Sequence, residues 1–345
     1  MQNRTASLTA IQKIEMVDIP MPSYGDNDVL IKVAHVGICG SDVHFFEDGC
    51  IGARKVRFPM TLGHECAGEV IETGKSVKNL KPGDLVAIEP GVPCGTCEFC
   101  KGGRYNLCPD MTFYSTPPVN GLMSRYVSFP AHLCFKLPPG VSTLEGALLE
   151  PLSVGLHSAV LGNVQFGKTV IILGGGCIGL MTILACRMLG ASRIIISDLY
   201  ANRLDNALAL GADEIVNASE TDPVQKILEL TDGKGADVVF ESAGNSKTAF
   251  QTSFVVANGG CIVLTGNIVG DVPFNFRNMT MKEAELKTVW RYRNTYPRAI
   301  EAVARGIVDL KRLRVELFDF EETQKGFERA MNEKQSVVKA VIRVS

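Results

Sequence analysis

The sequence has no long apolar run, almost no net charge and few aromatic residues. Its most hydrophobic stretch, residues 170–189, is interrupted by four glycines and Arg187, so it falls short of the roughly 20 apolar residues that cross a bilayer. Its 35 basic and 37 acidic residues leave a charge of −2, and without a basic cluster a nucleic-acid surface is disfavoured. The N-terminal residues contain no apolar signal core. We therefore expect a cytoplasmic protein with neither membrane nor nucleic-acid partners.

The chain changes its pattern twice along its 345 residues. Between residues 28 and 135, short strand-like segments alternate with Gly and Pro, which is typical of a compact β-rich or barrel-like unit. Between 169 and 290, six short apolar runs alternate with segments of helical periodicity, which predicts a parallel sheet covered by helices on both faces. The closing segment 336–344 reads as one more strand. We expect it to return to the first unit, so that the second unit is an α/β insertion.

A glycine-rich turn follows the first apolar strand of the second unit. The sequence GGGCIG at 174–179 matches G-x-G-x-x-G: Gly174 would form the turn, Gly176 would admit a pyrophosphate and Gly179 would allow helix and strand to pack. Asp198 ends the next strand, where a carboxylate binds the adenosine ribose and repels a 2′-phosphate. The pattern predicts a dinucleotide site that favours NAD over NADP. Arg203 nearby weakens this preference, and a turn that binds nothing is the alternative.

Eleven cysteines in a protein expected in the cytosol should be thiols or metal ligands. Four of them follow the spacing C-x2-C-x2-C-x7-C within a loop rich in Gly and Pro, namely Cys94, Cys97, Cys100 and Cys108. Four thiolates form a closed tetrahedral shell around zinc, so this site is predicted to be structural. An iron–sulfur cluster is the rival interpretation.

A second candidate metal site combines different donor types. Cys39 lies in GICGSDVH, His64 and Glu65 lie in GHE, and Glu150 lies in LEP. Mixed sulfur, nitrogen and oxygen ligands with an open position are typical of catalytic zinc. Taken singly, each residue also has an ordinary structural explanation. The six other cysteines sit mostly in apolar contexts, and we assign them to packing.

Together these segments resemble the zinc-containing medium-chain dehydrogenases, and within that family the sorbitol (polyol) dehydrogenases. The similarity runs from GICGSDVHFFEDG and LGHECAGEV through GALLEPLSVGLH and LGGGCIG to WRYRNTYP. The resemblance implies a GroES-like catalytic domain over 1–155 and 293–345, with a Rossmann domain inserted over 156–292. It also implies NAD and two zinc ions per chain, one catalytic in the cleft between the domains and one structural.

The resemblance also implies roles for individual residues. Cys39, His64 and Glu65 would bind the catalytic zinc, and Glu150 would hold its water or exchange with a ligand. The residues that would contact the dinucleotide are Gly174, Gly176, Ile178, Gly179, Asp198, Arg203, Thr265, Gly266, Asn267, Trp290 and Arg291. The residues that would contact the substrate are Phe45, Phe113, Glu150, Arg291 and Tyr292. Phe45 stands where several polyol dehydrogenases have tyrosine.

These assignments predict the reversible, zinc-dependent oxidation of a polyol such as sorbitol or xylitol to the ketose, with NAD as oxidant. Ser41 and His44 are candidates for relaying the proton, with a turn cap and a partly exposed histidine as the alternative. Rival activities are the oxidation of threonine, a sugar phosphate or a simple alcohol. A catalytically silent dinucleotide-binding protein is the alternative that is not an enzyme. We also expect a homodimer or homotetramer that pairs along the edge of the nucleotide sheet.

Overall fold

The computed structural model describes residues 2–345, which divide into two compact units. The first unit comprises residues 2–150, 296–304 and 314–345, and the second comprises 151–295 and 305–313. The helix α3 (Thr143–Leu161) carries the chain from one unit to the other. Among residues 2–345, no helix has both the length and the apolar character needed to cross a membrane.

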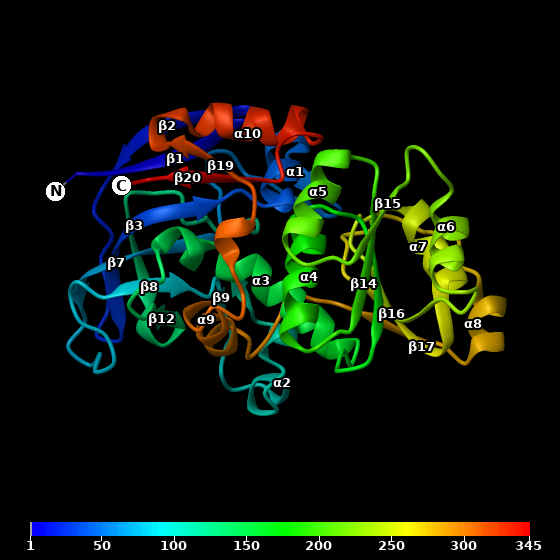
Figure 1. Ribbon diagram of the computed structural model, residues 1–345. Coiled ribbons are helices and arrows are strands. Elements are labelled where there is room, and N and C mark those ends of the chain that lie inside the picture. Colours follow the sequence, from blue (N-terminus) through cyan, green and yellow to red (C-terminus); the bar gives the residue numbers. More distant parts are fainter. Residues whose placement is uncertain (1) are drawn as a thin grey trace. The chain divides into compact units, whose positions relative to one another are not determined.

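The first unit is built on a seven-stranded sheet that joins the two ends of the chain. Strand β20 (Lys339–Arg343) pairs antiparallel with β3 (Asp28–Gly37), and β20 pairs parallel with β19 (Val315–Asp319). Figure 1 shows red β20 beside blue β3. The predicted return of the C-terminal strand is confirmed, and it completes a core that includes Phe318, Phe320 and Phe327.

The other elements of the first unit surround this sheet. Its remaining strands are β7 (Glu65–Thr73), β8 (Leu85–Ile88), β11 (Tyr126–Pro130) and β12 (Cys134–Lys136). The smaller sheets contain β1 (Asn3–Ala10), β2 (Lys13–Ile19), β4 (Cys50–Ile51), β5 (Arg54–Lys55), β6 (Met60–Thr61), β9 (Gly91–Val92) and β10 (Thr112–Phe113). The helices are α1 (Gly40–Asp48), α2 (Glu98–Lys101), α9 (Tyr296–Ala304) and α10 (Thr323–Asn332).

The second unit contains a six-stranded parallel sheet in the order β15-β14-β13-β16-β17-β18. This is the doubly wound order of dinucleotide-binding folds. The strands are β13 (Thr169–Leu173), β14 (Arg193–Asp198), β15 (Glu214–Asn217), β16 (Ala236–Glu241), β17 (Val256–Leu264) and β18 (Glu285–Thr288). The helices are α4 (Cys177–Met188), α5 (Ala201–Ala209), α6 (Pro223–Leu230), α7 (Ser246–Val255) and α8 (Phe276–Lys282). In Figure 1, α4 and α5 cover one face of this sheet, and α6, α7 and α8 cover the other.

The structural division differs in detail from the domain ranges expected from the sequence. The first boundary falls inside α3 after Glu150 instead of after residue 155, and residues 305–313 group with the nucleotide unit. A hydrogen bond from Asn206 Nδ2 to the Arg312 carbonyl ties this segment there. Strand β18 ends the nucleotide sheet and is largely exposed, but the expected dimer or tetramer stays a prediction.

A buried carboxyl group anchors the cysteine-containing loop to the first sheet. Glu89 directly follows β8, is 4% exposed, and accepts a hydrogen bond of 2.7 Å from the Tyr105 hydroxyl. Burial raises the pKa of Glu89 to about 7, although the bond from Tyr105 opposes the shift. Because the folded state then binds a proton more tightly than the unfolded state, the contribution of Glu89 to stability falls as pH rises from about 4.5 through 7.

We predict that Glu89→Gln removes this pH dependence, since the amide oxygen still accepts from Tyr105 without ionising. From pH 5 to pH 8, wild type should lose about 2–3 kcal/mol of unfolding free energy that the variant does not lose. Urea unfolding at both pH values measures the change, and exposed Glu328→Gln is the control. Equal pH profiles for wild type and Glu89→Gln would contradict the interpretation.

Candidate metal centres and dinucleotide pocket

Three predicted ligands of the catalytic metal come together in the first unit. A ligand atom from each of Cys39, His64 and Glu65 lies within 4.8 Å of the others. Cys39 is the N-cap of α1, His64 precedes β7, and Glu65 is the first residue of that strand. His64 and Glu65 are 5% and 1% exposed. A partly exposed thiol together with a buried imidazole and a buried carboxylate forms a donor set that suits zinc.

Asp42 orients this site, although sequence analysis did not single it out. It is fully buried in the first turn of α1, and its Oδ1 lies 3.5 Å from His64 Nδ1. Burial opposes the charged forms of both residues, but their mutual attraction prevails: the pKa of Asp42 is lowered and that of His64 is raised well above its ordinary value. A carboxylate behind one imidazole nitrogen directs the other toward a metal.

The contacts of Asp42 explain why it can stay charged inside the protein. Its carboxylate accepts hydrogen bonds from the Ser115 hydroxyl at 2.6 Å and from the backbone N–H groups of Cys39 at 3.1 Å and Gly63 at 3.3 Å. The spacing Cys39-x-x-Asp42 is that of a capping box. This spacing is the signal from which the position of Asp42 was predictable.

Glu65 pairs with a buried lysine from the last strand. Lys339 on β20 is 3% exposed, forms an ion pair with Glu65 Oε2, and donates a hydrogen bond of 3.0 Å to the Ile38 carbonyl. The same ammonium group therefore contacts the segments that carry two of the candidate ligands. A side chain at position 37 would collide with the Glu65 carboxylate, so Gly37 leaves the space that this pair occupies.

The remaining predicted catalytic and substrate residues of the first unit lie in different environments. Phe113 on β10 has its ring centroid 5.6 Å from that of His64, so it borders the donor cluster. Glu150 is 5% exposed but is absent from the cluster of converging ligand atoms found in residues 2–345. Phe45 is 2% exposed within the hydrophobic core. Ser41 is half-buried and His44 is exposed, 3.9 Å from Asp48.

The four predicted structural ligands also converge. One sulfur from each of Cys94, Cys97, Cys100 and Cys108 lies within 4.8 Å of the others, and all four are free of disulfides. The Cys97–Cys100 and Cys94–Cys100 sulfur distances are 3.4 and 4.0 Å, close to the roughly 3.8 Å expected around one zinc ion with 2.3 Å bonds. Backbone N–H groups donate to the Cys94, Cys97 and Cys108 sulfurs.

One thiol of this group is poised to ionise. Hydrogen bonds, first of all from Thr96, lower the pKa of Cys94 to about 6. Desolvation and the neighbouring thiols raise the pKa of Cys100 to about 12. A divalent cation bound by all four sulfurs would stabilise their ionised forms.

In the second unit, the glycine motif has the geometry that its pattern predicts. Gly174 has φ +109°, and a side chain there would come within 2.6 Å of the Ala243 backbone. Gly176 is the N-cap of α4 with open space where a side chain would be. Gly179 packs against the Gly174 carbonyl with no space for a methyl group. Ile178 is half-buried in the first turn of α4.

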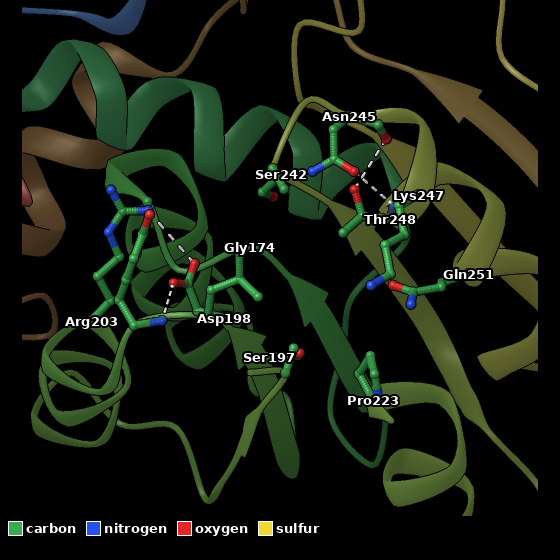
Figure 2. Close-up of a pocket in the computed structure, with 15 residues that line it drawn as sticks. Gly174, Ser197, Asp198, Arg203, Pro223, Ser242, Asn245, Lys247, Thr248 and Gln251 are labelled. Atoms are coloured by element: carbon green, nitrogen blue, oxygen red, sulfur yellow. Dashed lines mark hydrogen bonds and ion pairs between the residues drawn. The ribbon is translucent and has the colours of Figure 1, made fainter. Parts of the chain in front are cut away.

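Asp198 and Arg203 line a cavity of about 300 Å³ beside this turn. Asp198 accepts hydrogen bonds from the Gly175 N–H at 2.6 Å and the Tyr200 N–H at 2.9 Å, and its Oδ2 lies 3.7 Å from Arg203 Nη1. Figure 2 shows these two side chains on one side of the cavity and Asn245, Lys247 and Thr248 on the other. The cavity has the position of an adenosine ribose site.

The other predicted dinucleotide residues lie beyond the carboxyl ends of β17 and β18. Thr265 donates a hydrogen bond of 3.2 Å to Ser158, and Gly266 and Asn267 follow it. Trp290 is 47% exposed, and the Arg291 guanidinium lies 5.1 Å from its ring centroid. Arg291 has φ +55°, a left-handed conformation that non-glycine residues seldom adopt outside functional sites and turns. Tyr292 is buried.

The buried Lys339–Glu65 pair generates a stability prediction. In chelator-treated protein, Lys339→Met should cost about 3–5 kcal/mol of unfolding free energy, because it leaves the Glu65 carboxylate buried without its cation. Adding Glu65→Gln should recover at least half of that loss, since no buried charge then remains. Denaturant unfolding of wild type, both single variants and the double variant completes the cycle. If Lys339→Met lost less than 1 kcal/mol of unfolding free energy, Lys339 would not be the group that compensates the buried Glu65 carboxylate.

Comparisons with known proteins agree with both units. Residues 25–139 match the family described as "Alcohol dehydrogenase GroES-like domain", and residues 177–305 match "Zinc-binding dehydrogenase". The sorbitol dehydrogenase of Bacillus subtilis (strain 168) is 41% identical over 340 residues, covering 98% of this chain and 96% of that protein.

Two solved structures share the whole architecture. An Escherichia coli oxidoreductase/dehydrogenase of unknown specificity, described as involved in membrane biogenesis, has a TM-score of 0.96 and 42% identity, with complete coverage of both chains. A putative zinc-binding dehydrogenase of Sinorhizobium meliloti 1021 bound to NADP has a TM-score of 0.92 and 29% identity, again with complete coverage of both. The chain therefore belongs to the zinc-containing medium-chain dehydrogenase family, with a GroES-like domain and a Rossmann-type domain.

Proposed function

We propose that this protein oxidises a secondary hydroxyl of a polyol to a ketone, reversibly, with zinc and NAD. The convergence of Cys39, His64 and Glu65 carries the proposal. A zinc ion held there would make a substrate hydroxyl easier to deprotonate, and the dinucleotide would supply the oxidising power. Overall, the alcohol would lose one proton to the medium, and one hydrogen with its electron pair to the dinucleotide.

Several side chains around the candidate ligands would position them, shield them from water and carry the proton away. Asp42 lies 3.5 Å from His64 Nδ1, and Lys339 pairs with the Glu65 carboxylate, so charged neighbours would help to place both donors. Phe113 would shield the donor cluster from water because its ring packs beside His64. Ser41 and His44 in α1 are proposed to carry the released proton outward, since His44 is exposed.

Carboxylate chemistry supports a polyol over a simple alcohol. Buried Glu65 lies in the donor cluster, and buried Glu150 belongs to the same unit. A second carboxylate would accept a hydrogen bond from a neighbouring substrate hydroxyl, which a simple alcohol lacks. Arg291 and Tyr292 are proposed to contact substrate hydroxyls as well. The similarity to a sorbitol dehydrogenase points to the same substrate class.

One enzymatic experiment tests the proposal. The purified protein should reduce NAD with sorbitol or xylitol, and chelation of the catalytic zinc should lower kcat/KM at least 100-fold, with recovery on adding zinc. Ethanol, threonine and a sugar-alcohol phosphate serve as comparison substrates. A preference for one of these would replace the polyol assignment, and full activity in metal-free protein would refute the zinc mechanism. Dinucleotide binding without turnover of any alcohol would indicate a silent protein.

The pocket also supports NAD as the preferred dinucleotide. The Asp198 carboxylate lines the cavity where the ribose hydroxyls would lie, and its charge would repel a 2′-phosphate. Arg203 lines the same cavity and would attract that phosphate, so the two side chains oppose each other. The Sinorhizobium meliloti relative of this architecture has NADP bound, so the Arg203 side of this balance has a precedent in the fold.

We therefore predict that Asp198→Asn shifts the kcat/KM ratio for NADP over NAD upward at least tenfold. The substitution removes the repelling charge, keeps one of the two oxygens that accept from the backbone, and leaves the positive charge of Arg203 at the cavity. Initial rates with both dinucleotides measure the ratio, and Asp205→Asn on the exposed side of α5 is the control. An unchanged ratio would show that Asp198 does not select the dinucleotide.

A further inference from the structure

A second acidic residue, Glu241, lies at the carboxyl end of the parallel sheet, as Asp198 does. It is the last residue of β16, a strand paired on both sides with β13 and β17, and it is 0% exposed. Parallel strands of this fold bind ligands beyond their carboxyl ends. Glu241 therefore sits directly beneath the loops that would hold the dinucleotide, but it does not itself line the cavity.

One carboxyl oxygen of Glu241 organises the loop that follows β16. Its Oε1 accepts hydrogen bonds from the Ala243 N–H at 3.0 Å, the Gly244 N–H at 2.8 Å and the Thr248 hydroxyl at 2.7 Å. Three donors on one oxygen fix the path of residues 242–245 and the first turn of α7. The cavity is lined by Ser242, Ala243, Asn245 and Thr248 from this segment.

The backbone and the second oxygen of Glu241 extend this control to the neighbouring loop. The Glu241 carbonyl accepts from the N–H groups of Thr265 at 2.8 Å and Gly266 at 2.9 Å. A side chain at position 266 would collide with Glu241 Oε2, so the two loops can only approach because residue 266 is glycine. One residue thus contacts the loops that follow β16 and β17.

The carboxyl group is present without a compensating cation. Among the described residues, Oε2 has no hydrogen-bond partner, and no ion pair involves Glu241. Burial raises the pKa of Glu241, against the hydrogen bonds that Oε1 receives. The three bonds that Oε1 accepts tie this buried carboxyl group to the loop after β16.

We propose that Glu241 is a positioning residue for the dinucleotide, which fixes the 242–245 and 265–266 loops in the shape that binds it. This inference rests on the proposed function, because it presumes a dinucleotide in the cavity. A neutral amide retains the acceptor oxygen, so Glu241→Gln should preserve the loops, whereas Glu241→Leu has similar volume and no acceptor.

The test is the dissociation constant for NADH, measured by its fluorescence on the full-length protein. We expect Glu241→Leu to raise it at least tenfold and to raise the KM for NAD more than it lowers kcat. Glu241→Gln should stay within threefold of wild type. Val239→Ala, two residues earlier in the buried core of β16, is the control for lost stability and should stay within twofold despite a lower melting temperature.

A milder pair of variants covers the case in which Glu241→Leu does not fold. Thr248→Val removes one donor to Oε1, and Thr248→Ser keeps it; only the valine variant should weaken NADH binding, about three- to tenfold. The inference is overturned if Glu241→Leu binds like wild type, if Gln and Leu weaken binding equally, or if the Thr248 variants do not differ. Wild-type protein that binds neither NADH nor NADPH would overturn the proposed function as well.

Discussion

The first unit depends on the partners of its buried carboxylates. Asp42 and Glu65, at the candidate catalytic site, are almost completely removed from water, and each lies against a nitrogen group, His64 or Lys339. Without these neighbours, desolvation would cost several kcal/mol per charge. Because Asp42 and Lys339 also touch the segments around Cys39, the compensation and the placement of the ligands are one arrangement.

The dinucleotide unit is subject to a different constraint, because backbone groups would make most of the contacts with its ligand. Gly174, Gly176 and Gly179 keep side chains out of the turn where phosphate would approach helix α4. Backbone alone does not hold a loop in place, and carboxylates do so here: Asp198 accepts from the Gly175 N–H, and Glu241 accepts from the loop after β16. Acidic residues at the ends of β14 and β16, the two strands that flank β13, thus hold the glycine-rich loops in place.

Local patterns allowed much of this structure to be predicted. The six apolar runs after residue 169, the glycine motif and the cysteine spacing each depend on residues close together in sequence, and all three appear as expected. The hairpin of β1 and β2 and the helices α1 and α3 were not identified. Asp42 was recognisable only as a capping residue, and Lys339 looked like an ordinary strand residue, because its partner Glu65 is 274 positions away. Glu241 ends a strand like many surface acids. Its importance follows from hydrogen bonds that no sequence pattern records.

The route of the chain gives the metal centre a particular dependence on folding. Cys39, His64 and Glu65 come from the first segment of the unit, but Lys339 comes from β20, after the entire nucleotide unit has been traversed. Until β20 pairs with β3, Glu65 lacks its cation and Ile38 lacks the hydrogen bond from Lys339. The N-terminal segment thus holds the donor atoms, but the charges that let them stay buried are balanced only when the C-terminal strand is in place. Metal binding at this centre would therefore be coupled to formation of the β3–β20 pair, because Glu65 would serve both the metal and Lys339.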